Sequence, residues 1–447
     1  MKRMPTQTQL SGEQKKIVNF AIERSLFVQG GAGTGKTVVA IHRVKQAMAE
    51  GDLFGGKVGY MAYNRKLTET VSALFPWQRK GPLPTVRTAD AYFVRTYLGG
   101  RLSGDLLASE PECVAHLEAV RAEVFGERTS AIATKPAKFY LEEIAWMKGR
   151  ALASLEAYQA ANREGRGRAV RVTQEDRALL WQLKVRYDEH LHACGKADWQ
   201  DLHLSLLARP MQPTFRHLVI DEAQDLSPVM LTLLLRQIDW QNGGSCTLLA
   251  DSAQHIYPQG AMPRELRTLL KPYGYHPFTL TKNYRNPRPV AQAAEAILGE
   301  QPPEEESTLH ELPAESADDA SAKPALIQAS PTAIPDELRA LVKAHPGQVV
   351  FAFPTRERLA QARKFLRNAP IELSTYHGLK GLDFPYVVLM DCSAECFPMS
   401  EEEAVNHAHR KLLYVAMSRT TCRLFVAYPP TGRPSPLLAP ANDLFTR

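Results

Sequence analysis

One short segment near the N-terminus limits the possible folds more than any other part of the chain. Residues 30–37 read GGAGTGKT and fit the pattern G-x-x-x-x-G-K-[ST]. An apolar run at 25–30 precedes the segment, and an amphipathic stretch to about Glu50 follows it. A glycine-rich turn between a strand and a helix lets backbone N–H groups surround phosphates at the positive end of the helix dipole. The sequence therefore predicts a phosphate-binding loop in an α/β domain.

The pattern also assigns chemical roles to side chains of the loop. Lys36 is expected to neutralise the β- and γ-phosphates, and Thr37 to present its hydroxyl to Mg²⁺. The predicted nucleotide-binding residues of the loop are Gly30, Gly31, Ala32, Gly33, Thr34, Gly35, Lys36 and Thr37. ATP and Mg²⁺ are thus the expected cofactors, although the pattern does not say what ATP hydrolysis drives.

A second apolar run, at 216–221, ends in acidic residues. Asp221 is the last residue of this expected strand, and Glu222 follows it. An aspartate at a strand end can hold Mg²⁺, and the next carboxylate can polarise the attacking water. The run D-E-x-x-D alone is also consistent with an acidic turn or a helix cap. Its position after a phosphate-binding loop favours a catalytic pair, with Asp221 as the metal ligand and Glu222 as the base.

Strand-like and helical patterns divide the rest of the chain. Apolar runs typical of buried parallel strands occur at 25–30, 58–62, 216–221, 246–251, 349–353, 371–375, 386–390 and 423–428. Between 101 and 207 the spacing is helical, without a strand signal. The predicted parts are a first α/β domain at 1–100 and 208–280, a helical insertion at 101–207, and a second α/β domain at 281–447 with a flexible acidic loop at 300–323.

Composition excludes several classes of protein. No stretch of about 18 apolar residues occurs, and the N-terminal MKRMPTQTQL lacks the apolar segment of a secretory signal. The six cysteines are scattered, which favours free thiols over a metal site. The net charge of +6 includes a run of acidic residues at 300–319, so the rest of the chain is more basic and suits a polyanionic partner. We expect a cytoplasmic protein with no membrane partner.

Further short motifs follow one another in the order of a known family. They are LSGEQ at 10–14, YNR at 63–65, TAD at 88–90, DSAQHIY at 251–257, NYR at 283–285, TYHGLKGLDF at 375–384 and RKLLYVAMSR at 410–419. Taken singly, each is also consistent with an ordinary core or surface segment. Together with the two ATPase motifs, and in this order, they resemble the UvrD/Rep-type helicases of superfamily 1, in a reduced form. The resemblance implies two RecA-like P-loop NTPase domains of the α/β class, with ATP between them and a helical insertion in the first.

The resemblance also implies roles for residues outside the phosphate-binding loop. Gln14 would read the adenine, Gln254 would sense the γ-phosphate, and the ring of Tyr284 would stack on the base. Arg285 and Arg419 would reach the γ-phosphate from the second domain. The implied catalytic residues are Lys36, Asp221, Glu222, Gln254, Arg285 and Arg419. The implied nucleotide contacts beyond the loop are Gln14, Tyr284, Arg285, Gly381, Asp383 and Arg419.

A nucleic-acid track across both α/β domains is implied in the same way. Its expected residues are Asn64, Arg65, Thr88, Tyr257, Thr375 and His377. The insertion adds a basic stretch, for which a solvated loop is the alternative to a nucleic-acid contact. Its arginines are Arg163, Arg166, Arg168 and Arg171. The expected partner is single-stranded DNA or a junction of single strand and duplex, with RNA as an alternative and a protein partner also open.

The chain departs from the family pattern at several points. About 20 residues separate the run at 349–353 from Thr375, too few for the large helical domain that many relatives insert there. Asp90 and Asp383 stand where a histidine and a glutamate are usual, and no tryptophan closely follows Tyr257. We therefore expect ATP-driven 3′→5′ movement on single-stranded DNA with weak unwinding. The alternatives are an ATPase that remodels a protein or nucleoprotein partner, and a motor of opposite polarity.

Overall fold

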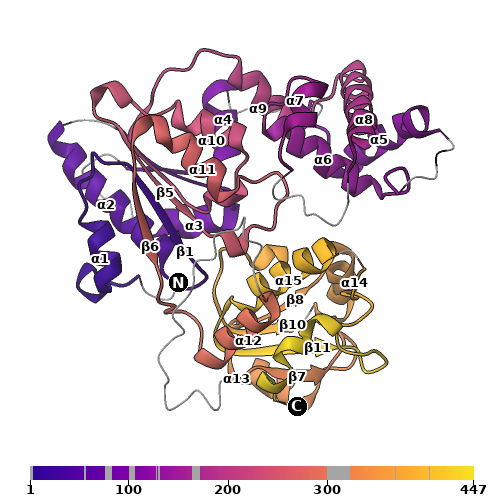
Figure 1. Ribbon diagram of the computed structural model, residues 1–447. Helices are drawn as coiled ribbons and strands as arrows, with labels where there is room; N and C mark the ends of the chain where they lie inside the picture. The colour runs from indigo at the N-terminus through magenta and orange to yellow at the C-terminus, as the bar shows by residue number, and fades with distance from the viewer. Residues whose placement is uncertain are drawn as a thin grey trace.

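The structure is a computed structural model in which two α/β bodies and a helical segment make up the fold (Figure 1). It describes residues 4–54, 57–75, 83–99, 106–126, 128, 131–163, 172–299, 323–367, 369–401 and 403–446. The helical segment projects from the first body over one end of the second (Figure 1).

The first body is built on a six-stranded parallel sheet. Its strands are β1 (Leu26–Gly30), β2 (Lys57–Ala62), β3 (Thr85–Thr88), β4 (Phe215–Ile220), β5 (Ser245–Ala250) and β6 (His276–Leu280). They lie in the order β3-β2-β4-β5-β1-β6, and each neighbouring pair runs parallel. The inner strand β5 is buried along its whole length, as expected where helices cover both faces of a parallel sheet.

Helices on the two faces of this sheet form two separate cores. Those on one face are α1 (Gly12–Val18), α2 (Lys36–Phe54) and α3 (Arg65–Ala73). Those on the other are α4 (Ala89–Tyr97), α10 (Pro228–Leu235) and α11 (Pro263–Leu270). This sandwich brings the carboxyl ends of β1, β4 and β5 to one edge of the sheet, the edge where α/β proteins bind ligands.

Between α4 and β4 the described residues form further helices, most of which share a core of their own. These helices are α5 (Glu110–Phe125), α6 (Ala137–Gly149), α7 (Leu155–Ala160), α8 (Gln174–Ala193) and α9 (Trp199–Leu207). Trp146, Tyr140 and Tyr158 are fully buried among α5, α6, α7 and α8. In the same segment the ammonium of Lys148 contacts the carboxylates of Asp188, Asp198 and Asp201 at 2.6–2.8 Å.

The second body carries a five-stranded parallel sheet. Its strands are β7 (Ala325–Gln328), β8 (Val349–Phe353), β9 (Glu372–Thr375), β10 (Phe384–Leu389) and β11 (Thr420–Tyr428), in the order β7-β11-β10-β8-β9. Its helices are α12 (Arg288–Leu298), α13 (Asp336–Ala344), α14 (Arg356–Leu366) and α15 (Glu403–Met417). Buried cores lie on both faces of this sheet as well.

The predicted fold class is confirmed, since two parallel-sheet α/β bodies frame a helical segment. The exact division into domains stays a prediction, and the acidic loop at 300–323 lies almost wholly outside the described residues. Three strands were not predicted: β3, β6 and β7. Each lies at an edge of its sheet, where one side of the strand is not covered by a neighbour and the apolar run is weaker. Among the described residues, no helix is long and apolar enough to cross a membrane.

Candidate nucleotide site and nucleic-acid face

The phosphate-binding loop joins β1 to α2, and its glycines are required by the geometry. Gly33 and Gly35 have positive φ values of 77° and 87°. A Cβ on Gly33 would lie 2.1 Å from Oδ1 of Asn283, and one on Gly35 would lie 2.4 Å from Nε2 of Gln14. Only glycine fits both this backbone conformation and this close approach. The loop is thus packed from both sides by segments that the sequence motifs also singled out.

Lys36 and Gln14 hold the loop from inside and from outside. The Lys36 ammonium donates to the carbonyls of Gly30 and Gly31 at 2.8 Å and pairs with Asp251 at 3.1 Å. The Gln14 amide donates to the Thr34 carbonyl at 3.0 Å. Gln14 therefore lies beside the loop, and its contact with adenine stays a prediction. Asp251 positions the lysine, a role that the motif did not assign.

The predicted metal ligands lie together where β4 ends. The Thr37 hydroxyl and the Tyr60 phenol each donate to Oδ2 of Asp221 at 2.8 Å. Burial, and then the charge of Glu222, raise the pKa of Asp221 to about 6. Tyr60 was missed by the sequence reasoning, because nothing in the run VGYMA marks one inward side chain as different from the others.

Glu222 occupies a constrained position next to this pair. Its backbone is left-handed, with φ 52° and ψ 43°, and Nε2 of Gln224 donates to its carboxylate at 2.6 Å. Burial alone would raise the pKa of Glu222, but the charges of Lys36, Lys380 and Arg419 bring it below its ordinary value. A buried, ionised carboxylate beside the phosphate-binding lysine is a suitable group to orient and polarise water.

Side chains of the second body reach across to the first. The Arg419 guanidinium donates to the side-chain oxygen of Gln254, and the Lys380 ammonium pairs with Asp225 at 2.7 Å. Arg419 is only 1% exposed, and burial followed by the charge of Arg285 lowers its pKa to about 10. The arginine therefore stays protonated at neutral pH. These contacts place Gln254 and Arg419 together, as the family pattern implies.

A cleft of about 340 Å³ lies between the two bodies. Its lining includes the predicted site residues Thr37, Glu222, Arg285, Gly381, Asp383 and Arg419. Arg285 pairs with Asp383 at 2.8 Å within this cleft. The Tyr284 ring is 54% exposed, while its backbone N–H donates to the Gly33 carbonyl at 2.8 Å. The exposed Tyr284 ring therefore starts beside the phosphate-binding loop, and its stacking on a base stays a prediction. Arg285 already contacts a carboxylate within the cleft.

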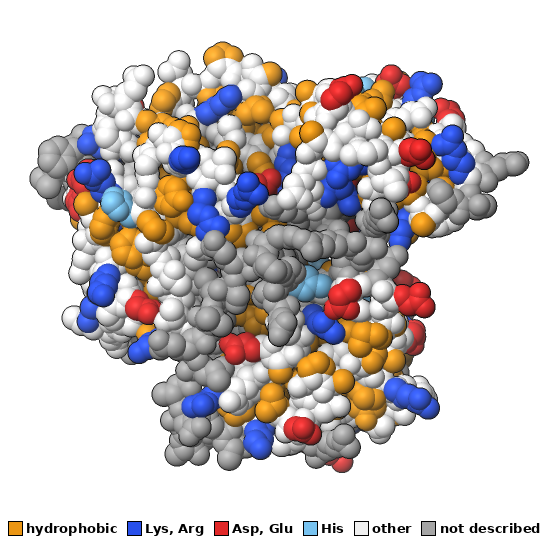
Figure 2. Space-filling model, viewed as in Figure 1, with side chains coloured by type: hydrophobic (Ala, Val, Ile, Leu, Met, Phe, Trp, Pro, Cys, Tyr) orange, Lys and Arg blue, Asp and Glu red, His pale blue; other side chains and the backbone are white. Residues whose placement is uncertain are grey.

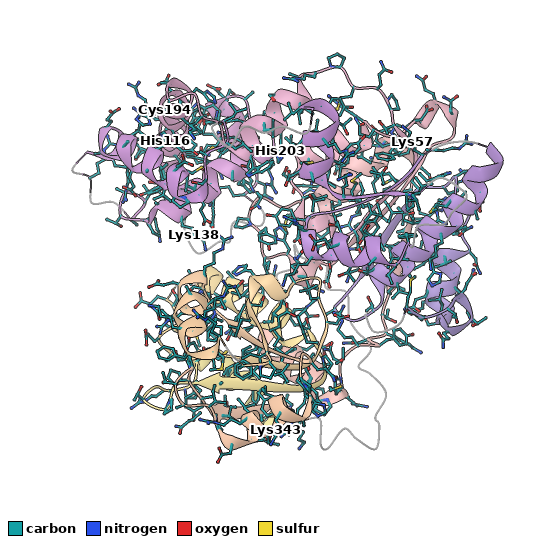
Figure 3. All side chains as sticks on the ribbon, turned by 180° about the vertical axis from the view of Figure 1, so that it is seen from behind. Lys57, His116, Lys138, Cys194, His203 and Lys343 are labelled. Carbon is teal, nitrogen blue, oxygen red and sulfur yellow. The ribbon has the colours of Figure 1, made fainter. Side chains whose placement is uncertain are left out.

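Two of the six expected nucleic-acid residues meet in an aromatic cluster. The Tyr257 ring lies 4.9 Å from the ring of Tyr63 and 6.3 Å from that of His377, measured between centroids, so the cluster joins the two bodies. Thr375 ends β9 two residues before His377, and its hydroxyl accepts from the backbone N–H of Gly378. Burial, and then Lys138 of the helical segment, lower the pKa of His377 to about 4. In Figure 3 Lys138 extends from the helical segment toward the second body.

The other expected nucleic-acid residues have mainly structural contacts. Asn64 caps α3 and donates to the Lys380 carbonyl at 2.7 Å, which links the two bodies. Thr88 caps α4, and Arg65 pairs with Glu69 on the surface. Among the described parts of the chain these three therefore contribute capping or ion-pair contacts, and their nucleic-acid role stays a prediction.

The basic stretch of the insertion needs a correction. Arg163 is not a free surface charge, because it forms an ion pair at 2.7 Å with Glu143, whose side chain is 0% exposed. A buried carboxylate needs such a partner, so Arg163 stabilises the core of the helical segment by balancing the charge of Glu143. The remaining three arginines of the stretch lie outside the described residues. On the face shown in Figure 2, the Lys and Arg side chains of the described residues lie among acidic and apolar ones.

Comparison with known proteins identifies the family that this geometry suggests. The model of an AAA domain matches residues 14–259, more than half of the chain, and that of the UvrD-like helicase C-terminal domain matches residues 352–430. The chain belongs to the UvrD/Rep-like helicases of superfamily 1. The two matches cover the phosphate-binding loop and Glu222 on one side and Arg419 on the other.

Two curated relatives and one solved structure are similar to this UvrD-like chain. DNA helicase IV of Escherichia coli is 22% identical over 97% of this chain and 70% of its own length. F-box DNA helicase protein 1 of Schizosaccharomyces pombe is 26% identical over 66% of this chain, which spans only 33% of that protein. The crystal structure of the C-terminal domain of a possible DNA helicase from Lactobacillus plantarum WCFS1 shares 18% identity over 36% of this chain and 97% of its own, with a TM-score of 0.27, too low to bear on the fold.

Proposed function

We propose that this chain is an ATP-driven motor that moves 3′→5′ along single-stranded DNA. One observation carries the proposal: groups for binding and cleaving ATP are divided between two bodies. Lys36 and Glu222 belong to the first, and Arg419 reaches them from the second by way of Gln254. Because phosphoryl transfer depends on charge placed around the γ-phosphate, a site completed across a cleft couples hydrolysis to cleft closure. The polarity rests on the family pattern.

DNA is proposed as the track because of the relatives and the aromatic cluster. Both curated relatives are named as DNA helicases. Flat side chains and cations are the groups that hold single strands, through base stacking and phosphate contacts. Tyr257 and His377 supply the rings, and Lys380 lies 5.4 Å from the Tyr257 ring centroid. Lys380 also pairs with Asp225 of the first body. A strand bound at this cluster would therefore lie next to a residue that links the two bodies.

We expect weak unwinding because the second body has only a short connection where many relatives carry a large insertion. Between β8 and β9 the described residues contain only α14, where the pattern of many relatives places a large insertion. Each base-pair step that is opened costs roughly 1.4 kcal/mol of stacking. The helical segment is then the remaining large element that could hold a junction while the motor steps. We expect single-strand movement to be efficient and duplex separation by monomers to be slow.

The decisive experiment measures ATP turnover with and without single-stranded DNA and RNA, followed by a polarity assay. A dye at the 5′ end of the strand should respond after a lag that grows with strand length. A length-dependent lag at the 3′ end would indicate the opposite polarity. Turnover that no polynucleotide stimulates would contradict the motor and favour an ATPase that remodels a protein partner.

A further inference from the structure

Three potential metal ligands lie together in the helical segment, away from the nucleotide cleft. They are His116 on α5, His190 on α8 and Cys194 just after α8. One ring nitrogen of each histidine and the sulfur of the cysteine all lie within 4.8 Å of one another. The two Nδ1 atoms are 3.0 Å apart. Figure 3 shows His116 and Cys194 close together on the outer part of this segment.

The fold explains why these residues meet. His190 and Cys194 are four positions apart at the end of α8, so they share one side of the helix. The α5 helix packs against α8 around Leu117 and Leu183, which brings His116 to the same side. Sequence spacing does not mark this group, because His116 is 74 positions from His190.

We propose that His116, His190 and Cys194 bind one divalent transition-metal ion, with Zn²⁺ the ion that suits them best. Two imidazoles and a thiolate are ligands that Zn²⁺ prefers, and a fourth position open to water completes a tetrahedron. Zn–N bonds of about 2.0–2.1 Å place two ligand nitrogens about 3.3 Å apart, close to the distance between the two Nδ1 atoms. The sulfur lies within 4.8 Å of both nitrogens, so it would have to approach by no more than about 1.3 Å, which a side-chain rotation at an exposed helix end permits.

Metal binding would also move protons within this group. In the metal-free pair one Nδ1–H donates to the other Nδ1. Binding moves that proton to the Nε2 of the same ring through solvent, and the Cys194 thiol loses its proton. One proton is therefore released for each ion bound when both rings start neutral.

A nearby acidic cluster differs from the histidine pair because a lysine of the protein lies within it. Asp188, Asp198 and Asp201 also converge, but the Lys148 ammonium contacts all three, and Lys184 pairs with Asp188 as well. Beside the histidine pair, by contrast, the charge of Lys196 acts on His116, but its ammonium pairs with Glu112 at 3.2 Å. Cys194 is exposed, which provides a path for an ion from solvent. A bound ion would fasten α5 to the end of α8 and stabilise the segment beside the proposed nucleic-acid track.

The test is a Co²⁺ titration of the full chain after removal of metals by a chelator. Co²⁺ bound by a thiolate gives a charge-transfer band that Co²⁺ at a site of oxygen ligands, such as Thr37 and Asp221, does not give. We expect one equivalent of Co²⁺ to produce this band, Zn²⁺ to displace it, and Zn²⁺ to raise the unfolding temperature.

Matched variants assign the band to the three residues. Cys194→Ser should abolish it, and His116→Gln should weaken binding by more than about 100-fold, since even the loss of a group that only orients a metal ligand costs about 10–100-fold. Cys422→Ser removes another exposed thiol and should leave the titration unchanged. A titration without a thiolate band, or a band that persists in Cys194→Ser, would overturn the proposal.

Discussion

The nucleotide cleft and the helical segment both bury charged side chains. In the cleft these side chains come from two bodies, whereas in the helical segment they come from neighbouring helices. In the cleft, Lys36, Glu222 and Arg419 belong to two bodies and are separated by up to several hundred positions. In the helical segment, Lys148 meets three aspartates of neighbouring helices inside one core. Charges that cross a cleft can separate when the bodies move, whereas charges inside one core hold it rigid. Removing a buried charge should therefore impair turnover in the first region and folding in the second.

The largest effect should come from the two central charges of the cleft. Lys36→Ala is expected to abolish hydrolysis by weakening phosphate binding. Glu222→Gln should keep ATP bound but slow turnover by about 10²–10⁴, the usual cost of losing a positioned general base. Steady-state turnover and binding of a fluorescent nucleotide separate the two effects. Glu69→Gln, at the exposed rim of the same cleft, is the control. Near-normal turnover in Glu222→Gln would remove Glu222 as the base.

Arg419 tests whether the cleft works across the two bodies. Arg419→Ala should lower turnover by roughly 10³, far more than it lowers ATP affinity, as for other arginines that complete a phosphoryl-transfer site in trans. Arg419→Lys should not restore activity, because an ammonium lacks the planar fork of the guanidinium. Arg410→Ala, which removes an ion pair with the exposed Glu403, controls for charge. Equal losses of affinity and turnover would show that Arg419 only supports the structure.

Lys148 tests the opposite region. Lys148→Met removes the buried ammonium that contacts all three carboxylates and leaves only Lys184 paired with Asp188, so we expect a loss of about 3–5 kcal/mol in the stability of the segment. Denaturant unfolding and hydrogen exchange in α6 and α8 measure this loss. Arg186→Met removes an exposed pair with Glu189 and should change stability by less than about 0.5 kcal/mol. If Lys148→Met instead abolished basal ATP turnover in a folded protein, the two regions would not be independent.

The smallest effect is expected at Lys138, which faces the second body. Lys138→Ala should reduce the salt dependence of single-strand binding by about 0.7 in log–log slope, the contribution of one neutralised phosphate. Lys343→Ala, at the far end of the second body in Figure 3, should leave the slope unchanged. Fluorescence anisotropy over a series of salt concentrations gives both slopes. Identical slopes for Lys138→Ala and the unaltered protein would place Lys138 outside the track.

Much of the fold followed from patterns that are local in the sequence. The inner strands were predicted because burial on both faces demands continuous apolar runs, as in VVFAF at 349–353. The edge strand β6 reads HPFTL, largely exposed and containing proline, so no such run marks it. Edge strands form because a neighbour offers hydrogen bonds, and that neighbour is distant in the sequence.

The sequence by itself determined the phosphate-binding loop and the acidic pair after β4, because each depends on a few consecutive residues whose backbone must take one shape. It also determined, by the order of the motifs, that Arg419 belongs to the same site. Only the tertiary structure decided which charges are free. Arg163 belongs to a basic stretch of the kind that contacts nucleic acid, yet its guanidinium is buried in an ion pair with Glu143. His116 and His190 look unremarkable in the sequence and meet only when α5 packs on α8. Partners far apart in the chain are chosen by packing, and packing is a property of the whole fold.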